Sequence, residues 1–276
     1  MRHPPLLTLL TDFGLEDYYV AAVKGTVLGR VPEATIVDVS HGVPAGDVER
    51  AAFLLAAAAP AFPAGTVHLA VVDPGVGSAR RILVVEAGGP LAGQLFVAPD
   101  NGLLTPVFAG ARSLRAAERP DLYRPGPGAT FHGRDRFAPL AAALLAGEAP
   151  AALGPEIADP VRLAAEPPRR DGGALLGRVA HVDRFGNLVT DIPTAWLPEA
   201  SAALRAEVGG RDAGIGGVAT ARAGHYRELP PGEPGVLPGS LGTLELALDG
   251  ESLAKRWGVG RGALVRILLD DDTSLA

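Results

Sequence analysis

Short apolar runs alternate with helix-like segments through the first half of this chain. Five runs are predicted to be strands, at residues 6–10, 34–39, 66–72, 82–86 and 94–97. Three segments have the apolar spacing of helices, at 17–30, 47–59 and 134–146. Because strands that alternate with helices usually form parallel sheets, we expect an α/β domain with a largely parallel sheet over residues 1–165.

The second half has a different pattern. A polar stretch rich in proline and glycine, at 166–173, is predicted to be a linker. Beyond it, turn signals separate short β-type runs at 177–182, 188–192, 203–208, 243–248 and 263–269. Only residues 251–257 have a helical signal there. We therefore expect a smaller all-β, barrel-like domain over residues 174–276.

Composition narrows the function classes. The formal net charge is −6 and no run is rich in lysine or arginine, which argues against nucleic acid and membrane partners. The longest apolar run, 51–59, is too short to span a bilayer, and no signal peptide is recognisable. The chain has no cysteine, so disulfides and thiolate chemistry are excluded. A cytoplasmic enzyme is the expectation.

Polar residues follow the predicted strands of the first half. Asp12, Ser40-His41, Asp73 and Asp100-Asn101 each come where a strand ends. The carboxyl ends of parallel strands meet at one edge of a sheet, so we expect these residues to lie along one rim. A carboxylate such as Asp12 suits the two hydroxyls of a ribose, although a helix cap is the structural alternative.

The most informative stretch is Val71–Arg81. It delivers Asp73 onto a turn with two glycines, and Arg80 follows seven positions later. Glycines allow a backbone to approach a ligand closely. A strand end with a surface ion pair would have the same pattern. His132 is a further candidate, because it lies in a loop that opens a helix, whereas His3, His68 and His181 are predicted to be structural.

Several common site types are missing from the sequence. The Gly75-Val76-Gly77 segment is not a dinucleotide-binding fingerprint, and neither Lys24 nor Lys255 follows a phosphate-binding loop. No paired-histidine spacing typical of zinc enzymes occurs, so no metal site is expected. The nucleophile elbow of the common serine hydrolases is also missing.

Seven motifs together resemble one known family. In order they are Thr11-Asp12-Phe13-Gly14, Asp38-Val39-Ser40-His41, Val72-Asp73-Pro74-Gly75-Val76-Gly77, Pro99-Asp100-Asn101-Gly102-Leu103-Leu104, Phe131-His132-Gly133-Arg134, Asp183-Arg184-Phe185-Gly186-Asn187 and Ser240-Leu241-Gly242-Thr243-Leu244-Glu245-Leu246-Ala247. This set is similar to that of the S-adenosyl-L-methionine (SAM) hydroxide adenosyltransferases, adenosine-forming SAM hydrolases related to the fluorinase and chlorinase enzymes. The resemblance runs from about Leu6 to Leu269.

The resemblance implies an architecture and a set of site residues. The family has an α/β domain, a barrel-like β domain and a homotrimer, with sites where one subunit's N-terminal domain meets a neighbour's C-terminal domain. It implies that the nucleophilic water is held by Asp73, Arg80 and His132, and the ribose by Asp12. It implies that the methionine part and the walls of the site are formed by Asp183, Asn187, Ser240, Phe185 and Tyr226. SAM is then the substrate, and no cofactor is implied.

The chain departs from the halide-using members of this group. Those enzymes resemble it but have a tyrosine where Asp73 stands, and the fluorinase has Tyr-Ser in place of His132-Gly133. They also have an insertion after the strand at Ile82, a tryptophan where Gly46 stands in the fluorinase, and commonly an aromatic where Thr243 stands. The charge of Asp73 would repel a halide, which favours water as the nucleophile.

Three other functions stay open at this stage. They are a chlorinase-like halide adenosyltransferase, a non-catalytic SAM or adenosine binder, and a nucleosidase that releases adenine.

The chemistry leaves one role open. SAM has a neutral leaving group at C5′, so the enzyme must mainly place a water in line and exclude other water. Imidazole, with a pKa near 6.5, suits a general base at neutral pH better than a carboxylate does, and an arginine cannot accept a proton. We expect Asp73 and His132 to orient and deprotonate the water, with Arg80 balancing charge. Which of the two accepts the proton is not decided by the sequence.

Overall fold

The computed structural model describes residues 4–125, 128, 130–198, 204–209 and 215–269 of the chain. Contacts divide the chain into two units, residues 1–164 and 165–276. No helix among the described residues is long and apolar enough to cross a membrane.

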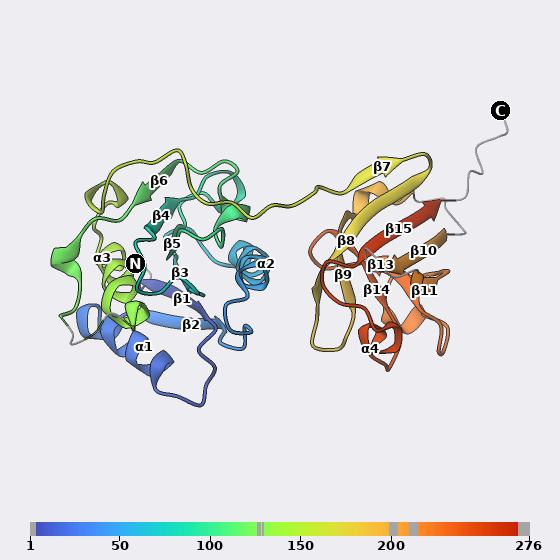
Figure 1. The fold of residues 1–276 in the computed structure, drawn as a ribbon, viewed down its shortest axis with the longest axis horizontal. Coiled ribbons are helices and arrows are strands. Elements are labelled where there is room, and N and C mark those ends of the chain that lie inside the picture. The colour runs from blue at the N-terminus through green and yellow to red at the C-terminus, as the bar shows by residue number, and fades with distance from the viewer. Residues whose placement is uncertain (1–3, 126–127, 129, 199–203, 210–214, 270–276) are drawn as a thin grey trace. The chain divides into compact units, whose positions relative to one another are not determined.

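The first unit contains a six-stranded sheet in the order β2-β1-β3-β5-β4-β6 (Figure 1). Its strands are β1 (Leu6–Thr11), β2 (Thr35–Ser40), β3 (Val67–Val71), β4 (Ile82–Glu86), β5 (Leu95–Pro99) and β6 (Ser113–Ala116). The four strands β2, β1, β3 and β5 are parallel neighbours, whereas β4 is antiparallel to both β5 and β6. The expected α/β fold with a largely parallel sheet is confirmed.

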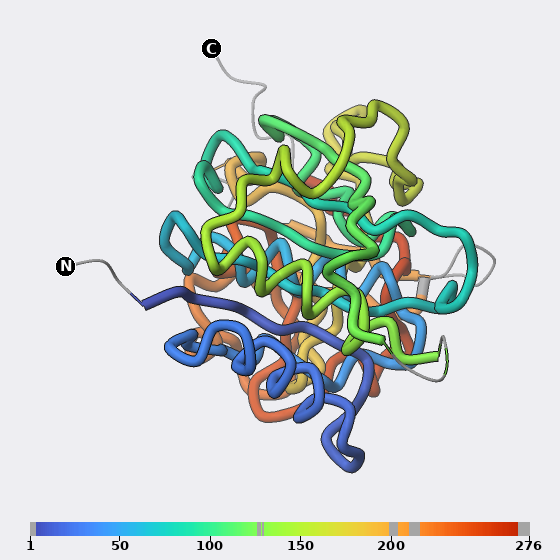
Figure 2. The backbone as a smooth tube through the Cα atoms, turned by 90° about the vertical axis from the view of Figure 1, so that its left-hand side faces the viewer, coloured from blue at the N-terminus to red at the C-terminus, as the bar shows by residue number. Residues whose placement is uncertain are grey.

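Helices cover both faces of this sheet. One face packs on α1 (Tyr19–Arg30) and α3 (Ala138–Leu145), which lie side by side (Figures 1 and 2). The other face packs on α2 (Val48–Ala58), whose first turn is capped by Asp47 through Arg50 N–H at 3.0 Å. Alternate residues of a strand point to opposite faces, so Leu9 joins the first core and Leu10 the second.

The parallel strands place their carboxyl ends at one edge. Because β1 and β3 are adjacent and in register, Asp12 after β1 and Asp73 after β3 begin neighbouring loops of that edge. A single turn of π-helix, η5 (Gly133–Phe137), precedes α3, and His132 lies directly before it. The first unit therefore positions three of the predicted site residues, Asp12, Asp73 and His132.

The second unit is all-β apart from short helical turns and α4 (Leu253–Trp257). Its strands are β7 (Arg169–Asp171), β8 (Ala174–Val182), β9 (Leu188–Pro193), β10 (Leu204–Gly209), β11 (Ile215–Ala219), β12 (Ala221–Arg222), β13 (Gly235–Pro238), β14 (Thr243–Ala247) and β15 (Leu264–Leu269). Their order is β11-β10-β15-β8-β9-β14-β13-β12, and β12 returns to contact β10, so the sheet is nearly closed. The expected barrel-like domain is confirmed.

Part of the predicted linker at 166–173 is a strand. Residues Arg169–Asp171 form β7, which pairs with β8 through a two-residue turn at Gly172-Gly173. Both glycines have positive φ, 50° and 79°, as a tight hairpin turn of the mirror-image type requires. A Gly-Gly pair is thus a hairpin signal here, and residues 169–171 of the predicted linker belong to the sheet of the second unit.

Candidate active site

The loop after β3 brings Arg80 back onto Asp73. Ser78 Oγ donates to the Gly75 carbonyl at 2.7 Å and accepts the Arg80 N–H at 3.2 Å, which folds the loop on itself. Arg80 Nε then donates to Asp73 Oδ1 at 2.8 Å, and Nη2 donates to Oδ2. The two side chains are only 9% and 6% exposed. Such a two-point, charge-assisted pair fixes the orientation of both groups.

His132 is the third member of this cluster. The second hydrogen of Arg80 Nη2 points to His132 Nδ1 at 3.0 Å. The imidazole is buried, with 2% exposure. Behind the guanidinium, the Phe137 ring lies with its centre 4.9 Å from Arg80 Cζ, a distance typical of a cation–π contact. Asp73, Arg80 and His132 are therefore brought together, as the sequence analysis expects.

This contact determines where the proton of neutral His132 lies. A guanidinium nitrogen can only donate, so Nδ1 must accept from Arg80. The neutral ring then has its hydrogen on Nε2, which is buried and has no hydrogen-bond partner among the described residues. Arg80 Nη1 is a second buried nitrogen without such a partner. Buried donors are seldom left unpaired, so these two N–H groups are available to an oxygen atom of a water or a ligand.

The surroundings keep His132 neutral. Burial lowers its pKa from the usual 6.5, and the positive charges of Arg136 and Arg80 lower it further. Asp73 and Asp135 act in the opposite direction but do not reverse the shift. At neutral pH the ring is therefore an uncharged donor at Nε2 and an acceptor at Nδ1.

A cavity of about 250 Å³ lies beside this cluster, lined by Asp12, Phe13, Tyr18, Tyr19, Val71, Asp73, Val76, Thr130, Phe131, His132 and Gly133. Asp12 Oδ2 accepts the Gly46 N–H at 2.8 Å, which holds the carboxylate in place. No hydrogen bond to Asp12 Oδ1 is found within the described part of the chain. Asp12 thus combines a fixed orientation with an unused acceptor, which suits a ligand hydroxyl.

Aromatic rings also line this cavity. The ring centres of Phe13 and Phe131 are 5.9 Å apart, and those of Tyr19 and Phe131 are 5.0 Å apart. The backbone of Gly133 lies close to these rings, because a Cβ there would be 3.1 Å from Phe13 Cζ and 3.3 Å from Phe131 Cε2. The cavity is therefore lined by aromatic side chains together with a few polar groups, which is typical of small-molecule sites.

The second unit brings together the other group of predicted residues. Asp183 Oδ1 accepts the Phe185 and Asn187 backbone N–H groups at 2.9 and 2.8 Å, and Oδ2 accepts Asn187 Nδ2 at 2.9 Å. These contacts close the loop between β8 and β9. They leave the Phe185 ring 75% exposed on it.

A residue that the sequence analysis missed joins this group. Glu245 on β14 is 6% exposed and accepts the Tyr226 hydroxyl at 2.6 Å. Burial raises the pKa of Glu245 and the negative charge of Asp183 adds to the rise, whereas the hydrogen bond from Tyr226 acts in the opposite direction. Ser240 is exposed in the turn between β13 and β14 and has no side-chain contact of this kind. The sequence signal for Glu245 was an acidic residue between the apolar residues Leu244 and Leu246.

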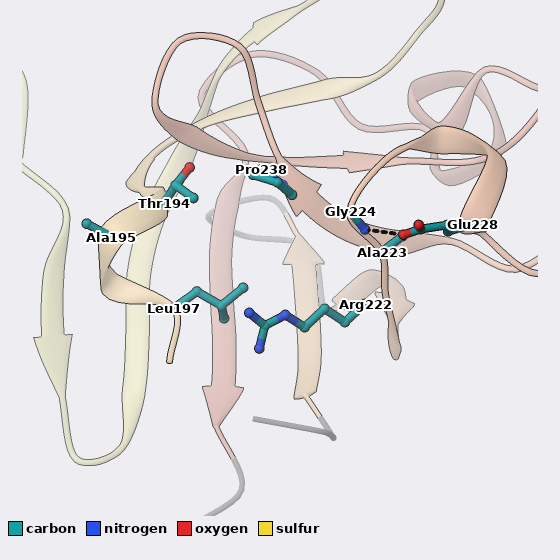
Figure 3. Close-up of a pocket in the computed structure, with 8 residues that line it drawn as sticks. All are labelled: Thr194, Ala195, Leu197, Arg222, Ala223, Gly224, Glu228 and Pro238. Carbon is teal, nitrogen blue, oxygen red and sulfur yellow. Dashed lines mark hydrogen bonds between the residues drawn. The ribbon is translucent and has the colours of Figure 1, made fainter. Parts of the chain in front are cut away.

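A larger cavity of the second unit, about 490 Å³, contains none of the predicted residues. It is lined by Thr194, Ala195, Leu197, Arg222, Ala223, Gly224, Glu228 and Pro238 (Figure 3). Arg222 donates to the Pro198 carbonyl at 2.6 Å, and Glu228 accepts the Gly224 N–H at 2.7 Å. Its charged groups are thus used by the protein itself, unlike those of the cluster around Arg80.

Comparison with known proteins agrees with this geometry. Residues 7–154 match the SAM hydroxide adenosyltransferase N-terminal domain, and residues 177–266 match the C-terminal domain of the same family. The chain belongs to the SAM hydroxide adenosyltransferase family. The resemblance read from the seven motifs is confirmed.

Relatives from other organisms cover nearly the whole chain. A protein of Thermus thermophilus named (R)-S-adenosyl-L-methionine hydrolase is 41% identical, over 94% of this chain and 98% of the relative. One of the same name from Salinispora tropica is 38% identical, over 97% and 99%. A fluorinase from an Actinoplanes species is more distant, at 30% identity over 95% and 97%. The hydrolases of this family are therefore nearer to the chain than the fluorinases are.

Solved structures show the same fold. A crystal structure of an uncharacterized conserved protein from Thermotoga maritima has a TM-score of 0.86 and 34% identity, and covers 95% of this chain and 99% of its own. A conserved hypothetical protein from Thermus thermophilus has a TM-score of 0.73 and 38% identity, with the same coverage.

Two other motifs expected at the rim, Asp100-Asn101 and Ser40-His41, do not line the 250 Å³ cavity. Asn101 donates to the Val72 carbonyl at 2.9 Å, and Asp100 accepts from Arg81 Nε and from Val161 N–H, each at 2.8 Å. They hold the loops of the rim in place. His41 is buried at 5% exposure and does not line the 250 Å³ cavity. Position at a strand end therefore predicts proximity to the rim but not contact with a ligand.

Proposed function

We propose that this chain hydrolyses SAM to adenosine and L-methionine by in-line attack of a water-derived oxygen on C5′. The observation that carries the proposal is the buried cluster of Asp73, Arg80 and His132 beside a cavity that also holds Asp12. Four relatives at 37–41% identity that are named (R)-S-adenosyl-L-methionine hydrolase support the substrate. For the same reason we propose the (R)-epimer as the preferred form.

The substrate needs little help to release its leaving group. The sulfonium of SAM leaves as the neutral thioether of methionine, so no general acid has to protonate it. The protein has to hold the oxygen nucleophile behind C5′ and keep other water away. The aromatic wall of the cavity serves the second purpose.

The tautomer of His132 decides the roles in this mechanism. Because Nε2 already has a hydrogen, it donates to the nucleophilic oxygen and cannot accept a proton from it. Asp73 retains lone pairs beyond those used by Arg80, so it is the acceptor. As the O–C5′ bond forms, the C5′–S electron pair moves to sulfur, and the proton of the oxygen passes to Asp73. An oxygen that is gaining a third bond is a far stronger acid than a carboxylic acid, so a weak base suffices.

Arg80 is the centre of the arrangement. It fixes Asp73 at two points and His132 at one, and its charge stabilises hydroxide character on the oxygen. Asp12 would bind the ribose hydroxyls through its unused Oδ1. No step of this mechanism calls for a cofactor or a metal ion.

The remainder of SAM needs further walls. A cavity of about 250 Å³ is smaller than the roughly 300–1,000 Å³ of typical small-molecule sites. We assign the methionine and adenine contacts to Asp183, Asn187, Ser240, Phe185 and Tyr226, supplied by the C-terminal unit of a second copy in a homotrimer. The exposed ring of Phe185 supports this assignment, since an aromatic wall is useful only once it is covered. The cysteine-free composition is consistent with a cytoplasmic location.

The reaction is tested by incubating the purified protein with resolved (R)- and (S)-SAM, with and without chloride, followed by chromatography with mass detection. Adenosine plus methionine, formed faster from the (R)-epimer and not affected by chloride, is the expected result. A chlorinated nucleoside would make the protein a halide adenosyltransferase, and free adenine would make it a nucleosidase. Bound but intact SAM would mean a binding protein.

Shared sites between subunits are tested by complementation. His132→Ala and Asp183→Ala variants are each expected to lose most of their activity. If they are unfolded together and refolded as a mixture, hybrid trimers will contain sites with both residues intact. Activity that returns in the mixture supports the shared site, whereas no recovery despite mixed trimers would contradict it.

A further inference from the structure

His41 is buried behind the cavity rather than in it. It directly follows β2, the strand next to β1, and it is 5% exposed. Its Nδ1 lies 2.8 Å from Thr11 Oγ1, the last residue of β1. Its Nε2 lies 3.1 Å from Asp38 Oδ1, close enough for an electrostatic contact but outside hydrogen-bond geometry.

These neighbours give the contact a direction. The carboxylate of Asp38 can only accept, so the hydrogen of a neutral His41 belongs on Nε2. Nδ1 then accepts the hydroxyl hydrogen of Thr11. Thr11 Oγ1 in turn accepts the backbone N–H of Phe13 at 3.3 Å. The result is one chain of contacts that runs from the Phe13 backbone through Thr11 and His41 to Asp38.

The same histidine holds the turn a second time. Its backbone carbonyl accepts the Gly14 N–H at 2.9 Å. The turn of residues 11–14 is therefore attached to His41 twice, through the Thr11 hydroxyl and through the Gly14 amide. This turn carries Asp12 and Phe13, which both line the 250 Å³ cavity, and Phe13 packs against Gly133 next to His132.

We propose that His41 is a positioning residue for substrate binding. Acting through Thr11, it holds the turn of residues 11–14 so that Asp12 and Phe13 meet the nucleoside part of the substrate. The inference rests on the proposed SAM hydrolysis, in which Asp12 binds the ribose. Displacement of a binding group by about 1 Å can cost up to a hundredfold in rate, so a buried contact this close to the site affects more than stability.

The chain offers a matched control for this proposal. Thr8, three residues earlier on β1, makes the same kind of contact, with its Oγ1 2.7 Å from His68 Nδ1. Both threonines are fully buried. His68 does not line the cavity, and its other nitrogen faces Gln94 Oε1 at 3.1 Å. Thr8→Val and Thr11→Val thus remove equivalent Thr–His contacts from one strand, and only the second touches the turn.

The experiment measures SAM turnover and thermal unfolding for both valine variants. We expect similar losses of thermal stability, a rise in KM of about tenfold for Thr11→Val with a smaller change in kcat, and kinetics within twofold of the wild type for Thr8→Val. Equal kinetic effects in both variants would overturn the proposal. Thr11→Ser, which keeps the hydroxyl, should restore KM and serves if the valine variant does not fold.

A second pair of variants separates the two sides of the ring. The amide of His41→Asn lies near the former Nδ1 and can still contact Thr11, whereas that of His41→Gln lies near Nε2. We expect Asn to retain most of the affinity for SAM and Gln to lose it. The reverse order would place the function at Asp38 and contradict the route through Thr11.

Amide hydrogen exchange gives a readout that does not depend on turnover. Exchange at Gly14, whose N–H is bonded to the His41 carbonyl, should be faster in Thr11→Val and unchanged in Thr8→Val. If the wild type fails to hydrolyse SAM, the proposed function fails, and exchange still tests the hold of His41 on the turn. If the wild type is active but the two valine variants exchange alike, only the present inference fails.

Discussion

His68 and His132 are both buried histidines of the first unit, yet their surroundings differ in one respect. His68 lies within the sheet, stacked on Phe96 at 4.5 Å, with partners at both nitrogens. His132 lies at the rim with a partner at Nδ1 alone. Burial lowers the pKa of both. A ring nitrogen without a partner among the described residues, rather than burial or a shifted pKa, distinguishes His132, which we propose to be functional, from His68.

The largest expected effect concerns Arg80, the central residue of the cluster formed by Asp73, Arg80 and His132. Arg80→Ala should lower kcat by about 10³-fold or more, because it removes the clamp on Asp73 and the donor to His132 together. SAM affinity should change much less, which steady-state kinetics and calorimetry will show. An equal loss in binding and in kcat would contradict the assignment.

The adjacent arginine provides the control. Arg81 also pairs with buried Asp100, at 2.7 Å, but a third of its side chain is exposed and it does not contact His132. Arg81→Ala should leave kcat within about threefold of the wild type and mainly reduce stability. If both variants lose activity alike, the cluster around Arg80 has no special role.

The next prediction distinguishes a donor from a base at position 132. His132→Ala should lose about 10²–10³-fold in kcat, the usual effect of removing one positioned donor. His132→Gln places an amide N–H near the former Nε2 and should recover at least tenfold of that loss. If the imidazole were instead the proton acceptor, Gln would be as inactive as Ala.

The pH profile of the wild type tests the same point. The pKa of His132 is lowered, so the neutral ring persists below pH 6.5. Protonation would put a hydrogen on Nδ1, which faces the Arg80 donor, and would break the cluster. The acid limb of kcat/KM should therefore lie below pH 6.5, and a limb above that value would contradict the neutral donor.

His68 should control stability instead of rate. Its pKa is lowered from 6.5 to about 4 by burial, so the unfolded chain takes up the proton first. The stabilisation is complete above pH 6.5 and is lost as the pH falls toward 4, by about 2 kcal/mol between pH 7 and pH 5. Urea unfolding should show a smaller loss over this range in His68→Leu. An identical loss in both proteins would remove His68 as the cause.

The sequence predicted the strand ends of the first unit because a polar residue after an apolar run is a local signal. It did not predict that β4 would run antiparallel to β5. Only residues 87–94 separate these strands, and a parallel crossover needs about a dozen residues, so the connection length contained that information. The pairing direction follows from that loop and not from the apolar pattern itself.

Within the candidate site, residue types were predictable but proton positions were not. Asp73, Arg80 and His132 could be named from motifs, whereas the tautomer of His132 depends on Arg80 approaching Nδ1 from 52 positions away. Glu245 was missed for the same reason, since its partner Tyr226 is 19 positions distant. His41 was expected at the rim, but its contact with Thr11, 30 positions away, was not predicted. Pairings of this kind arise only when the sheet has brought separate loops together.

The smallest expected effect concerns two buried phenylalanine rings, one beside Arg80 and one beside His68. Phe137 lies under Arg80 and Phe96 lies under His68, and both are fully buried. Phe137→Leu keeps an apolar side chain but removes the π face, worth about 0.5–2 kcal/mol, so kcat should fall by roughly 2- to 30-fold. Phe96→Leu should reduce only the free energy of unfolding, by about 1 kcal/mol or more. Steady-state kinetics and urea unfolding of the two variants will show whether loss of a buried ring lowers kcat beside Arg80 but not beside His68. If Phe96→Leu is fully folded but less active, the surroundings of His68 and His132 are coupled. The absence of a partner at His132 Nε2 would then not be enough to indicate function.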